Sequence, residues 1–256
     1  MAADLAARID LCSVVRLHAK RIAGVTNYYA FVHNWLPEAR RGASPAYAQW
    51  EADSELLFTQ GPMTDLDIVE AYVTWQLDKF FVRDISFDAV QGSQMIGHLE
   101  KRRAGIAIDV PQHAKNMTPG INELESAVAS GRFHTNSRVL LWALANLRRK
   151  TVGLSLRQPV RPEDGTKKID PAVALIMAMR STALKGLDEV FRPRVLLIDA
   201  TGPVIDAATG QSVEGKSAPP PHPGFTQIRM RGTGDIKWLP PTSAQYLIQE
   251  GAAELI

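Results

Sequence analysis

One segment constrains the fold of this chain more than any other. Residues 169–179 read IDPAVALIMAM, and every position after Pro171 is apolar. A helix with apolar side chains on all of its faces is stable only when protein surrounds it. The segment therefore predicts a buried helix from Asp170 to about Lys185, and a core large enough to enclose it.

The charged residues at the start of this helix admit two interpretations. Asp is a preferred N-cap residue and Pro171 suits the first helical turn, so Asp170 could serve only to begin the helix. Alternatively, a buried helix holds its first carboxylate rigidly beside Lys167 and Lys168. A rigid carboxylate next to a basic loop suits a metal site that acts on a phosphodiester.

Length and charge set broad limits on the function. The chain has 256 residues, of which 45% are hydrophobic, and a net charge of +2. This allows one large domain plus a small module, and it neither requires nor excludes a nucleic-acid partner. The basic residues are clustered at 101–103, 148–150, 167–168, Arg229 and Arg231. One such cluster is typical of solvated surface, but their recurrence near carboxylates favours phosphate contacts.

The compartment follows from what the sequence lacks. Cys12 is the single cysteine, so no disulfide can form within the chain. No apolar run approaches the roughly 20 residues of a membrane span, and charged residues interrupt the first ten positions. We expect a soluble, cytoplasmic protein with no membrane contact.

The order of the predicted elements indicates an α/β fold. Two opening strands, close in sequence, favour antiparallel pairing, whereas strands that alternate with helices favour parallel pairing. A mixed sheet flanked by helices is therefore expected. The predicted strands are 9–18, 27–34, 80–87 and 105–110, and the predicted helices are 47–57, 65–79, 94–103, 118–130 (with Thr118 as cap) and 138–147, followed by a loop or hairpin over 151–168.

The composition changes near residue 190. Short strands are expected at 194–199, 225–231 and 236–239, and a final helix at about 243–253. We therefore predict two domains, with 1–190 forming the main α/β domain and 191–256 forming a small β-rich accessory module with a terminal helix. Residues 210–217 (GQSVEGKS) match the P-loop pattern, but three prolines follow where the required helix would begin. No ATP binding is expected.

Three aspartates recur in comparable settings. Asp4 lies before the first predicted strand, Asp88 directly follows a later strand, and Asp170 begins the buried helix. In open α/β sheets, sites gather at the carboxyl ends of strands. Carboxylate oxygens are the ligands that Mg²⁺ and Mn²⁺ prefer. Because the chain has 27 acidic residues, this spacing alone does not define a site.

Five segments together resemble the nuclease domain of tailed-phage large terminase subunits, which cut genome DNA during packaging. The segments are ADLAARIDLCSVV (3–15), HNWLPEA (33–39), VRDISFDAVQGSQMIGHLE (82–100), KNMTPGINELESAVASGRFHTNSRVLLWALAN (115–146) and KKIDPAVALIMAM (167–179). The resemblance covers roughly residues 1–185. It implies a ribonuclease H-like mixed sheet and a DNA endonuclease that hydrolyses phosphodiesters with two Mg²⁺ or Mn²⁺ ions.

The resemblance also implies roles for individual residues. The family's three metal-holding, catalytic aspartates fall on Asp4, Asp88 and Asp170, with Asp10 a lesser candidate. His134 and Trp142, which lie in a packing region, are interpreted as structural residues, and Asn146 lies there too. The basic residues implied to contact DNA are Lys150, Arg157, Arg161, Lys167 and Lys168.

The chain departs from the family in ways that leave alternatives open. The family's large subunits carry an ATPase domain before the nuclease, and only three residues precede Asp4, where an apolar strand would run. The expected partners are double-stranded DNA and a separate terminase ATPase subunit, a small terminase or a portal protein, in the host cytoplasm for a phage-encoded chain. One alternative is a catalytically weak or inactive packaging or assembly adaptor; another is a different ribonuclease H-like nuclease, such as a junction resolvase.

Overall fold

The computed structural model describes residues 1–163 and 167–186, together with short strands in the last 61 residues. The chain separates into two compact units. The first comprises Met1–Leu66 and Val82–Phe191, and the second comprises Asp67–Phe81 and Arg192–Ile256. Within the described residues, no helix has both the length and the apolar character needed to cross a lipid bilayer.

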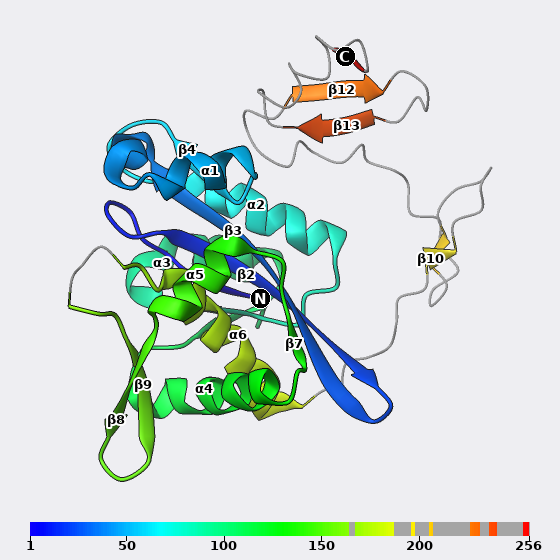
Figure 1. Ribbon diagram of the computed structural model, residues 1–256. Helices are drawn as coiled ribbons and strands as arrows, with labels where there is room; N and C mark the ends of the chain where they lie inside the picture. The colour runs from blue at the N-terminus through cyan, green and yellow to red at the C-terminus, as the bar shows by residue number, and fades with distance from the viewer. Residues whose placement is uncertain are drawn as a thin grey trace. The chain divides into compact units, whose positions relative to one another are not determined.

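A mixed sheet organises the first unit (Figure 1). Its strands lie in the order β4-β3-β2-β1-β5-β6, and β7 pairs with β3 beside this path. Strands β1, β2 and β3 are antiparallel neighbours, whereas the β1–β5, β5–β6, β3–β4 and β3–β7 pairs are parallel. The predicted mixed sheet is therefore confirmed. The strands are β1 (Ala2–Asp4), β2 (Cys12–Ile22), β3 (Val25–Pro37), β4 (Leu56–Thr59), β5 (Ile85–Phe87), β6 (Ala107–Asp109) and β7 (Phe133–His134).

The first strand is short but has a neighbour on both sides. Ala2 is in register with Val15 of β2 and with Ser86 of β5, and Ala2 and Ala3 are fully buried. Beyond the strand, the Met1 carbonyl oxygen accepts a hydrogen bond from the Ser86 N–H at 3.0 Å. Hydrogen bonding on both edges therefore fixes β1 despite its length of three residues.

Helices α4 (Ala114–Ala129), α5 (Arg138–Asn146) and α6 (Asp170–Lys185) share one core with the sheet. Residues Ala172–Met179 of α6 are each at most 4% exposed, as the apolar sequence requires. The predicted bounds of this helix are confirmed. Where α4 crosses α6, Gly120 lies so close that a Cβ atom there would be 2.1 Å from the Ile176 carbonyl oxygen.

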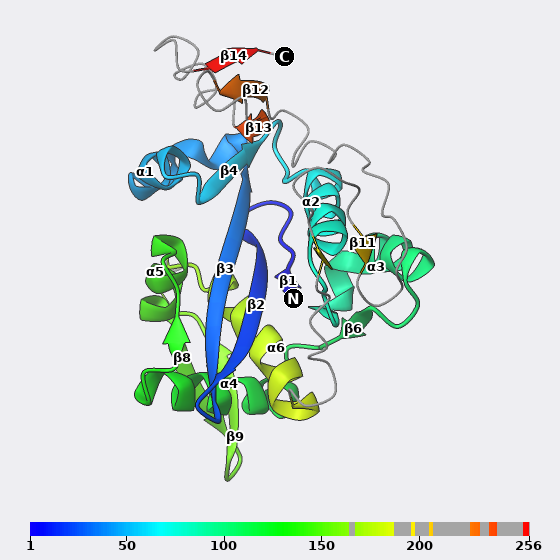
Figure 2. The same cartoon turned by 90° about the vertical axis from the view of Figure 1, so that its right-hand side faces the viewer.

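The opposite face of the sheet is covered by α3 (Ala89–Arg102), which connects β5 to β6 (Figure 2). A Cβ atom on Gly92 would lie within 3.7 Å of Phe87, which alternates with the residues that face α6. A second core joins α1 (Ala46–Ala52) to β4 and α5, next to the short helix η1 (Glu38–Ala43). There Trp142 packs edge-on against Trp50, with the ring centroids 5.0 Å apart, which confirms its structural interpretation.

Several predicted boundaries were wrong. The strand expected over 80–87 forms only over Ile85–Phe87. Helix α4 begins at Ala114 rather than Thr118, with Pro119 inside it, because the Thr118 hydroxyl does not cap a helix but donates to the Ala114 carbonyl at 2.6 Å. Helix α3 begins at residue 89 rather than 94. The helix expected over 47–57 ends at Ala52, since Ser54 has a positive φ of 58° that turns the chain into β4.

A hairpin fills most of the segment expected to be a loop or hairpin. It is formed by β8 (Arg148–Val152) and β9 (Leu156–Val160). The Thr118 hydroxyl anchors it, because it accepts the Arg157 N–H at 2.8 Å. The hairpin is thereby fixed to α4, on the same unit as the sheet.

Among its described residues, the second unit contains α2 (Leu66–Lys79), close to its predicted bounds, and five short strands. These are β10 (Leu196–Leu197) paired with β11 (Ile205–Asp206), and a sheet of β13 (Ile236–Leu239), β12 (Thr226–Met230) and β14 (Ala253–Leu255). The three predicted strands of this region are therefore present. Of the predicted terminal helix, only Ala253 is among the described residues, where it begins β14, and the P-loop-like segment 210–217 lies outside them.

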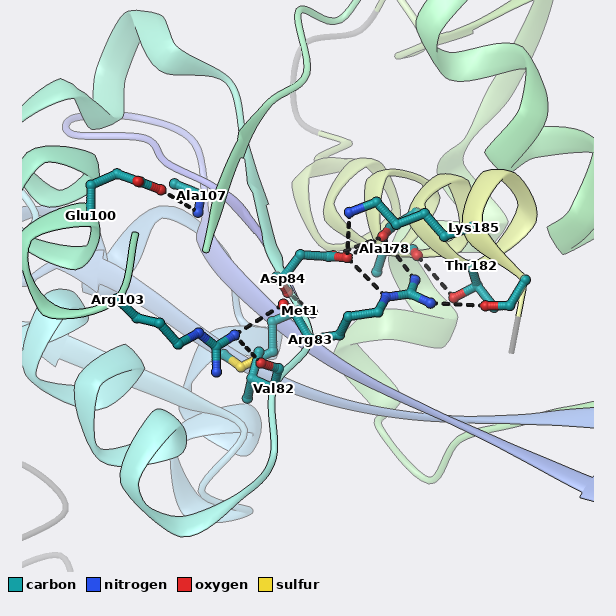
Figure 3. Close-up of polar contacts among 12 residues, drawn as sticks. Met1, Val82, Arg83, Asp84, Glu100, Arg103, Ala107, Ala178, Thr182 and Lys185 are labelled. Atoms are coloured by element: carbon teal, nitrogen blue, oxygen red, sulfur yellow. Dashed lines mark hydrogen bonds and ion pairs between the residues drawn. The ribbon is translucent and has the colours of Figure 1, made fainter. Parts of the chain in front are cut away.

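A buried ion cluster ties the start of β5 to the end of α6 (Figure 3). The Asp84 side chain is 4% exposed and accepts from Arg83 at 2.9 Å, Lys185 at 3.1 Å and the Ser181 hydroxyl at 2.7 Å. Burial opposes ionisation of Asp84, but the Ser181 hydrogen bond and the nearby cations outweigh it and hold the pKa of Asp84 below its usual value. The carboxylate thus locks β5 to α6 in its charged form.

The crossing of α4 and α6 gives a direct test of packing. Gly120→Ala should destabilise the protein by about 3 kcal/mol, because the added methyl group meets the backbone of α6, which cannot yield as a side chain would. Gly97→Ala is the matched control: Gly97 also lies in a helix, with open space around it, and the change should stabilise by about 0.5 kcal/mol. Urea unfolding measures both. Equal effects of the two variants would contradict the close crossing.

The ion cluster predicts a stability difference that depends on pH. Because the folded pKa of Asp84 is lowered, its stabilising effect is fully present above the unfolded pKa of about 4 and is lost as the pH falls through the folded value. Asp84→Asn should therefore lower the free energy of unfolding by about 2 kcal/mol near pH 7 and by much less at about pH 3. The loss near pH 7 is no larger because Arg83 and Lys185, which lose their partner, keep partial access to water. Urea unfolding at the two pH values checks this. A cost that did not change with pH would contradict it.

Candidate functional site

The sheet brings two of the predicted aspartates together. Ala3 is in register with Phe87 across the parallel β1–β5 pair, which places Asp4 beside Asp88 at the carboxyl ends of adjacent strands. Side chains alternate along a strand, so Asp4 shares a face with Ala2, which packs in the core that contains α6. Asp88 directly follows β5, and its charge acts on Asp4. The two carboxylates therefore lie close to each other.

The third aspartate reaches this region from α6. Asp170 is the first residue of the helix and is 6% exposed. Ile169 occupies the N-cap position, and the Asp170 carboxylate instead accepts the Leu11 N–H at 3.3 Å. The interpretation of Asp170 as a simple helix cap is therefore wrong, because its side chain bonds to the loop that follows β1.

The electrostatics of the carboxylates show that they crowd one another. Burial raises the pKa of Asp4 well above its usual value, and the charge of Asp170 raises it further, with smaller effects from Asp88 and Asp10. Burial and then the charge of Asp10 raise the pKa of Asp170 to about 6, against the Arg161 charge and backbone N–H donors. The described structure thus collects negative charge at the carboxyl ends of β1 and β5 and at the start of α6.

Asp10 has a different environment. Arg161 donates to both of its carboxylate oxygens, at 3.1 and 3.2 Å, and the Lys168 ammonium donates at 2.7 Å. Burial opposes ionisation of Asp10, but the hydrogen bonds from Arg161 and Lys168 outweigh it and hold its pKa below the usual value. The Asn146 amide donates to the Lys168 carbonyl at 3.4 Å, so it supports this segment as well as the core. Asp10 therefore holds two basic side chains, Arg161 and Lys168, beside the other carboxylates.

The five predicted DNA-contacting residues lie in three places. Arg161 and the buried Lys168 belong to the carboxylate region through Asp10. Lys150 and Arg157 lie on the β8–β9 hairpin, where Lys150 is exposed and Arg157 donates to Glu125 of α4 at 2.6 Å. Lys167 is exposed at the start of the segment that leads into α6. His134, the remaining residue of the packing region, is exposed and stacks on Tyr29.

Sequence reasoning missed one residue of this region. The Gln112 side chain, on the loop between β6 and α4, donates to a carboxylate oxygen of Asp4 at 3.0 Å. Its position shortly after a predicted strand is a feature that it shares with Asp88. A neutral amide carries no charge pattern, however, so nothing in the sequence linked it to an aspartate 108 positions away.

The donor atoms suit a hard divalent cation in kind. Asp4, Asp88 and Asp170 offer only carboxylate oxygens, the ligands favoured by Mg²⁺ and Mn²⁺, and the mutual repulsion of their charges would be relieved by a cation. Over the described part of the chain, no three His, Cys, Asp or Glu side chains are already arranged as a metal-holding group. The carboxylates would have to draw together around an ion.

Comparison with known proteins places this geometry in a family. The family model described as terminase large subunit, endonuclease domain matches residues 1–185. The chain is 30% identical over 195 residues to Protein YmfN of Escherichia coli (strain K12), an alignment that covers 70% of this chain and 42% of that protein. The chain thus spans less than half of that curated relative.

Two solved structures are similar. The crystal structure of the HK97 bacteriophage large terminase aligns with a TM-score of 0.61 and 23% identity, over 70% of this chain and 38% of that one, which supports the ribonuclease H-like mixed fold. The large terminase nuclease from thermophilic phage G20c aligns with a TM-score of 0.40 and 14% identity, over 69% of this chain and 77% of that one. From the family match over residues 1–185, the chain belongs to the terminase large subunit endonuclease domain family.

Proposed function

We propose that this chain is a metal-dependent endonuclease that cuts double-stranded DNA during phage genome packaging. The observation that carries the proposal is the convergence of Asp4, Asp88 and Asp170, from three separate segments, at the carboxyl ends of β1 and β5. Convergence of this kind in a chain of the terminase endonuclease family is best explained by a shared task for the three carboxylates.

The three aspartates would hold two Mg²⁺ or Mn²⁺ ions. Such ions, when bound, activate water for attack on the phosphorus and stabilise the leaving oxygen. The protein contributes rigid backbone placement, from which the side chains would draw together around the ions: Asp4 is held by two strands and Asp170 by a buried helix. Their raised pKa values, which result from burial and repulsion, describe carboxylates that gain from a nearby cation.

The basic residues would hold the DNA backbone. Arg161 and Lys168 lie beside the carboxylates and would contact the phosphate being cut, while Lys150, Arg157 and Lys167 would contact phosphates further along. Contacts of this kind position the duplex without reading its sequence, and they weaken steeply with added salt. Arg157 would have to exchange Glu125 for a phosphate.

The wider setting of the proposal concerns partners. We propose that residues 1–190 act as the nuclease domain and that 191–256 act as an accessory module that docks a small terminase, a portal protein or another packaging component. ATP hydrolysis would come from a terminase ATPase. The protein would act in the cytoplasm of the host.

Cleavage assays test the proposal directly. Purified protein should cleave supercoiled and linear plasmid in the presence of Mn²⁺ or Mg²⁺ but not in EDTA. Asp88→Ala and Asp170→Asn should each lower the rate by about two orders of magnitude or more, because each removes a charged oxygen donor from the ions. Asp53→Asn is the matched control. Asp53 is a carboxylate that directly follows α1 and pairs with Arg138, outside the candidate site. Metal-dependent cleavage that survives Asp88→Ala would contradict the assignment.

The same assay separates the alternatives. Folded protein that binds DNA but does not cleave it under any metal condition would indicate a packaging adaptor, which the lack of a ready-made metal group among the described residues would then explain. Cleavage of four-way junctions in strong preference to linear duplex would indicate a resolvase.

The crowded carboxylates also predict a gain in stability when one is neutralised. The folded pKa of Asp170 is about 6, above the unfolded value of about 4, so the folded protein binds the extra proton and becomes less stable as the pH rises through this window. In EDTA, Asp170→Asn should therefore be more stable than wild type by about 2 kcal/mol near pH 7, and by much less near pH 4. Urea unfolding at both pH values measures this. A variant that is less stable at both would show that Asp170 has a structural role instead.

A further inference from the structure

Gln112 stands on a well-anchored loop. It lies between β6, which ends at Asp109, and α4, which begins at Ala114. The Val110 N–H donates to the Phe87 carbonyl at 2.7 Å, and the Asn116 side chain donates to the Pro111 carbonyl at 2.9 Å. Val110 is fully buried. The backbone that carries Gln112 is therefore fixed to β5, the strand that Asp88 follows.

The hydrogen bond from Gln112 restrains the Asp4 carboxylate in an unfavourable setting. Asp4 faces the charges of Asp170, Asp88 and Asp10, and repulsion would turn its carboxylate away from them. The Gln112 amide donates to one oxygen at 3.0 Å, which restrains the carboxylate and leaves its second oxygen for other partners. As a neutral donor, Gln112 does this without cancelling the charge that a cation would need.

The same residue also contacts the hairpin. The Gln158 side chain of β9 donates to the Gln112 carbonyl at 3.4 Å, and the neighbouring Arg157 N–H is held by Thr118 at 2.8 Å. Gln112 therefore bonds to Asp4 through its side chain and to the hairpin through its backbone. A movement of the hairpin would therefore shift the loop that orients Asp4.

From these contacts we propose that Gln112 is a positioning residue, which sets the Asp4 carboxylate for binding a divalent cation. The proposal rests on the proposed function, because it concerns the same carboxylate site. Gln112 does not touch the reacting atoms; it acts through Asp4, as hydrogen-bonding partners of metal-binding side chains commonly do.

Mn²⁺ binding tests this without relying on catalysis. Metal-free wild type and Gln112→Ala are titrated with Mn²⁺, and binding is followed by isothermal titration calorimetry at a temperature at which both proteins are folded. The half-maximal Mn²⁺ concentration should rise about tenfold in the variant. Gln112→Met, which keeps the length of the side chain but lacks the amide donor, should shift the midpoint similarly and guards against a folding defect in the alanine variant.

The matched control is Gln49→Ala. Gln49 also donates to an aspartate at 3.0 Å, in this case Asp53 on α1's exposed side, so it loses the same kind of hydrogen bond elsewhere. Its Mn²⁺ midpoint should not change. Plasmid cleavage adds a second readout: in the Gln112 variants the KM for DNA should stay within about twofold of wild type, while the Mn²⁺ requirement rises about tenfold.

The outcomes are distinct for the two proposals. A Mn²⁺ midpoint that is equal in wild type and both Gln112 variants, with wild type still cleaving, overturns the positioning role and leaves the nuclease intact. Wild type that neither responds to Mn²⁺ nor cleaves DNA overturns both. An equal shift in Gln49→Ala would show that loss of any such hydrogen bond is sufficient, and it would also overturn the proposal.

Discussion

The burial of α6 against the sheet is the constraint on which the rest of this structure depends. Its apolar residues fill the core under β1, β2 and β3, and its crossing with α4 is close enough that only glycine fits at position 120. Each end of the helix then serves a different purpose. The first residue, Asp170, reaches the loop after β1, whereas Lys185, the last, joins Ser181 in holding Asp84 at the start of β5. One rigid helix therefore sets the position of both ends of the central strands.

The carboxylates of this protein are of two kinds, and the difference identifies the candidate site. Asp84 and Asp10 are each bonded to two basic side chains, and their pKa values are lowered. Asp4 and Asp170 are bonded to neutral N–H donors, crowd each other, and have raised pKa values. A fold gains nothing in stability from the second arrangement, because charge is buried without compensation. Its presence beside carboxylates that are paired with basic side chains argues for a task that uses carboxylates without basic partners.

Sequence reasoning succeeded where a local pattern carried the information. The bounds of α6 follow from an apolar run and a proline, and the alternation of strands and helices was enough to predict the mixed sheet. It failed where contacts between residues far apart in the sequence determine the role of a residue. Thr118 looks like a cap until its bond to Arg157 is known, and Gln112 has no recognisable role until Asp4 lies beside it. The three aspartates were predicted through family resemblance, since 27 acidic residues make their spacing uninformative by itself.

The short first strand raised the question of whether Asp4 could be placed well enough to act. In a sheet, a residue is located by its ladder partners as much as by the length of its own strand. Asp4 is in register with Ser13 of β2, and the residue before it is in register with both Val14 and Phe87. Neighbours on both edges, together with Gln112 at its side chain, restrain Asp4 from three directions. A strand of three residues is therefore enough to position the carboxylate, because the surrounding elements supply the restraint that its own length does not.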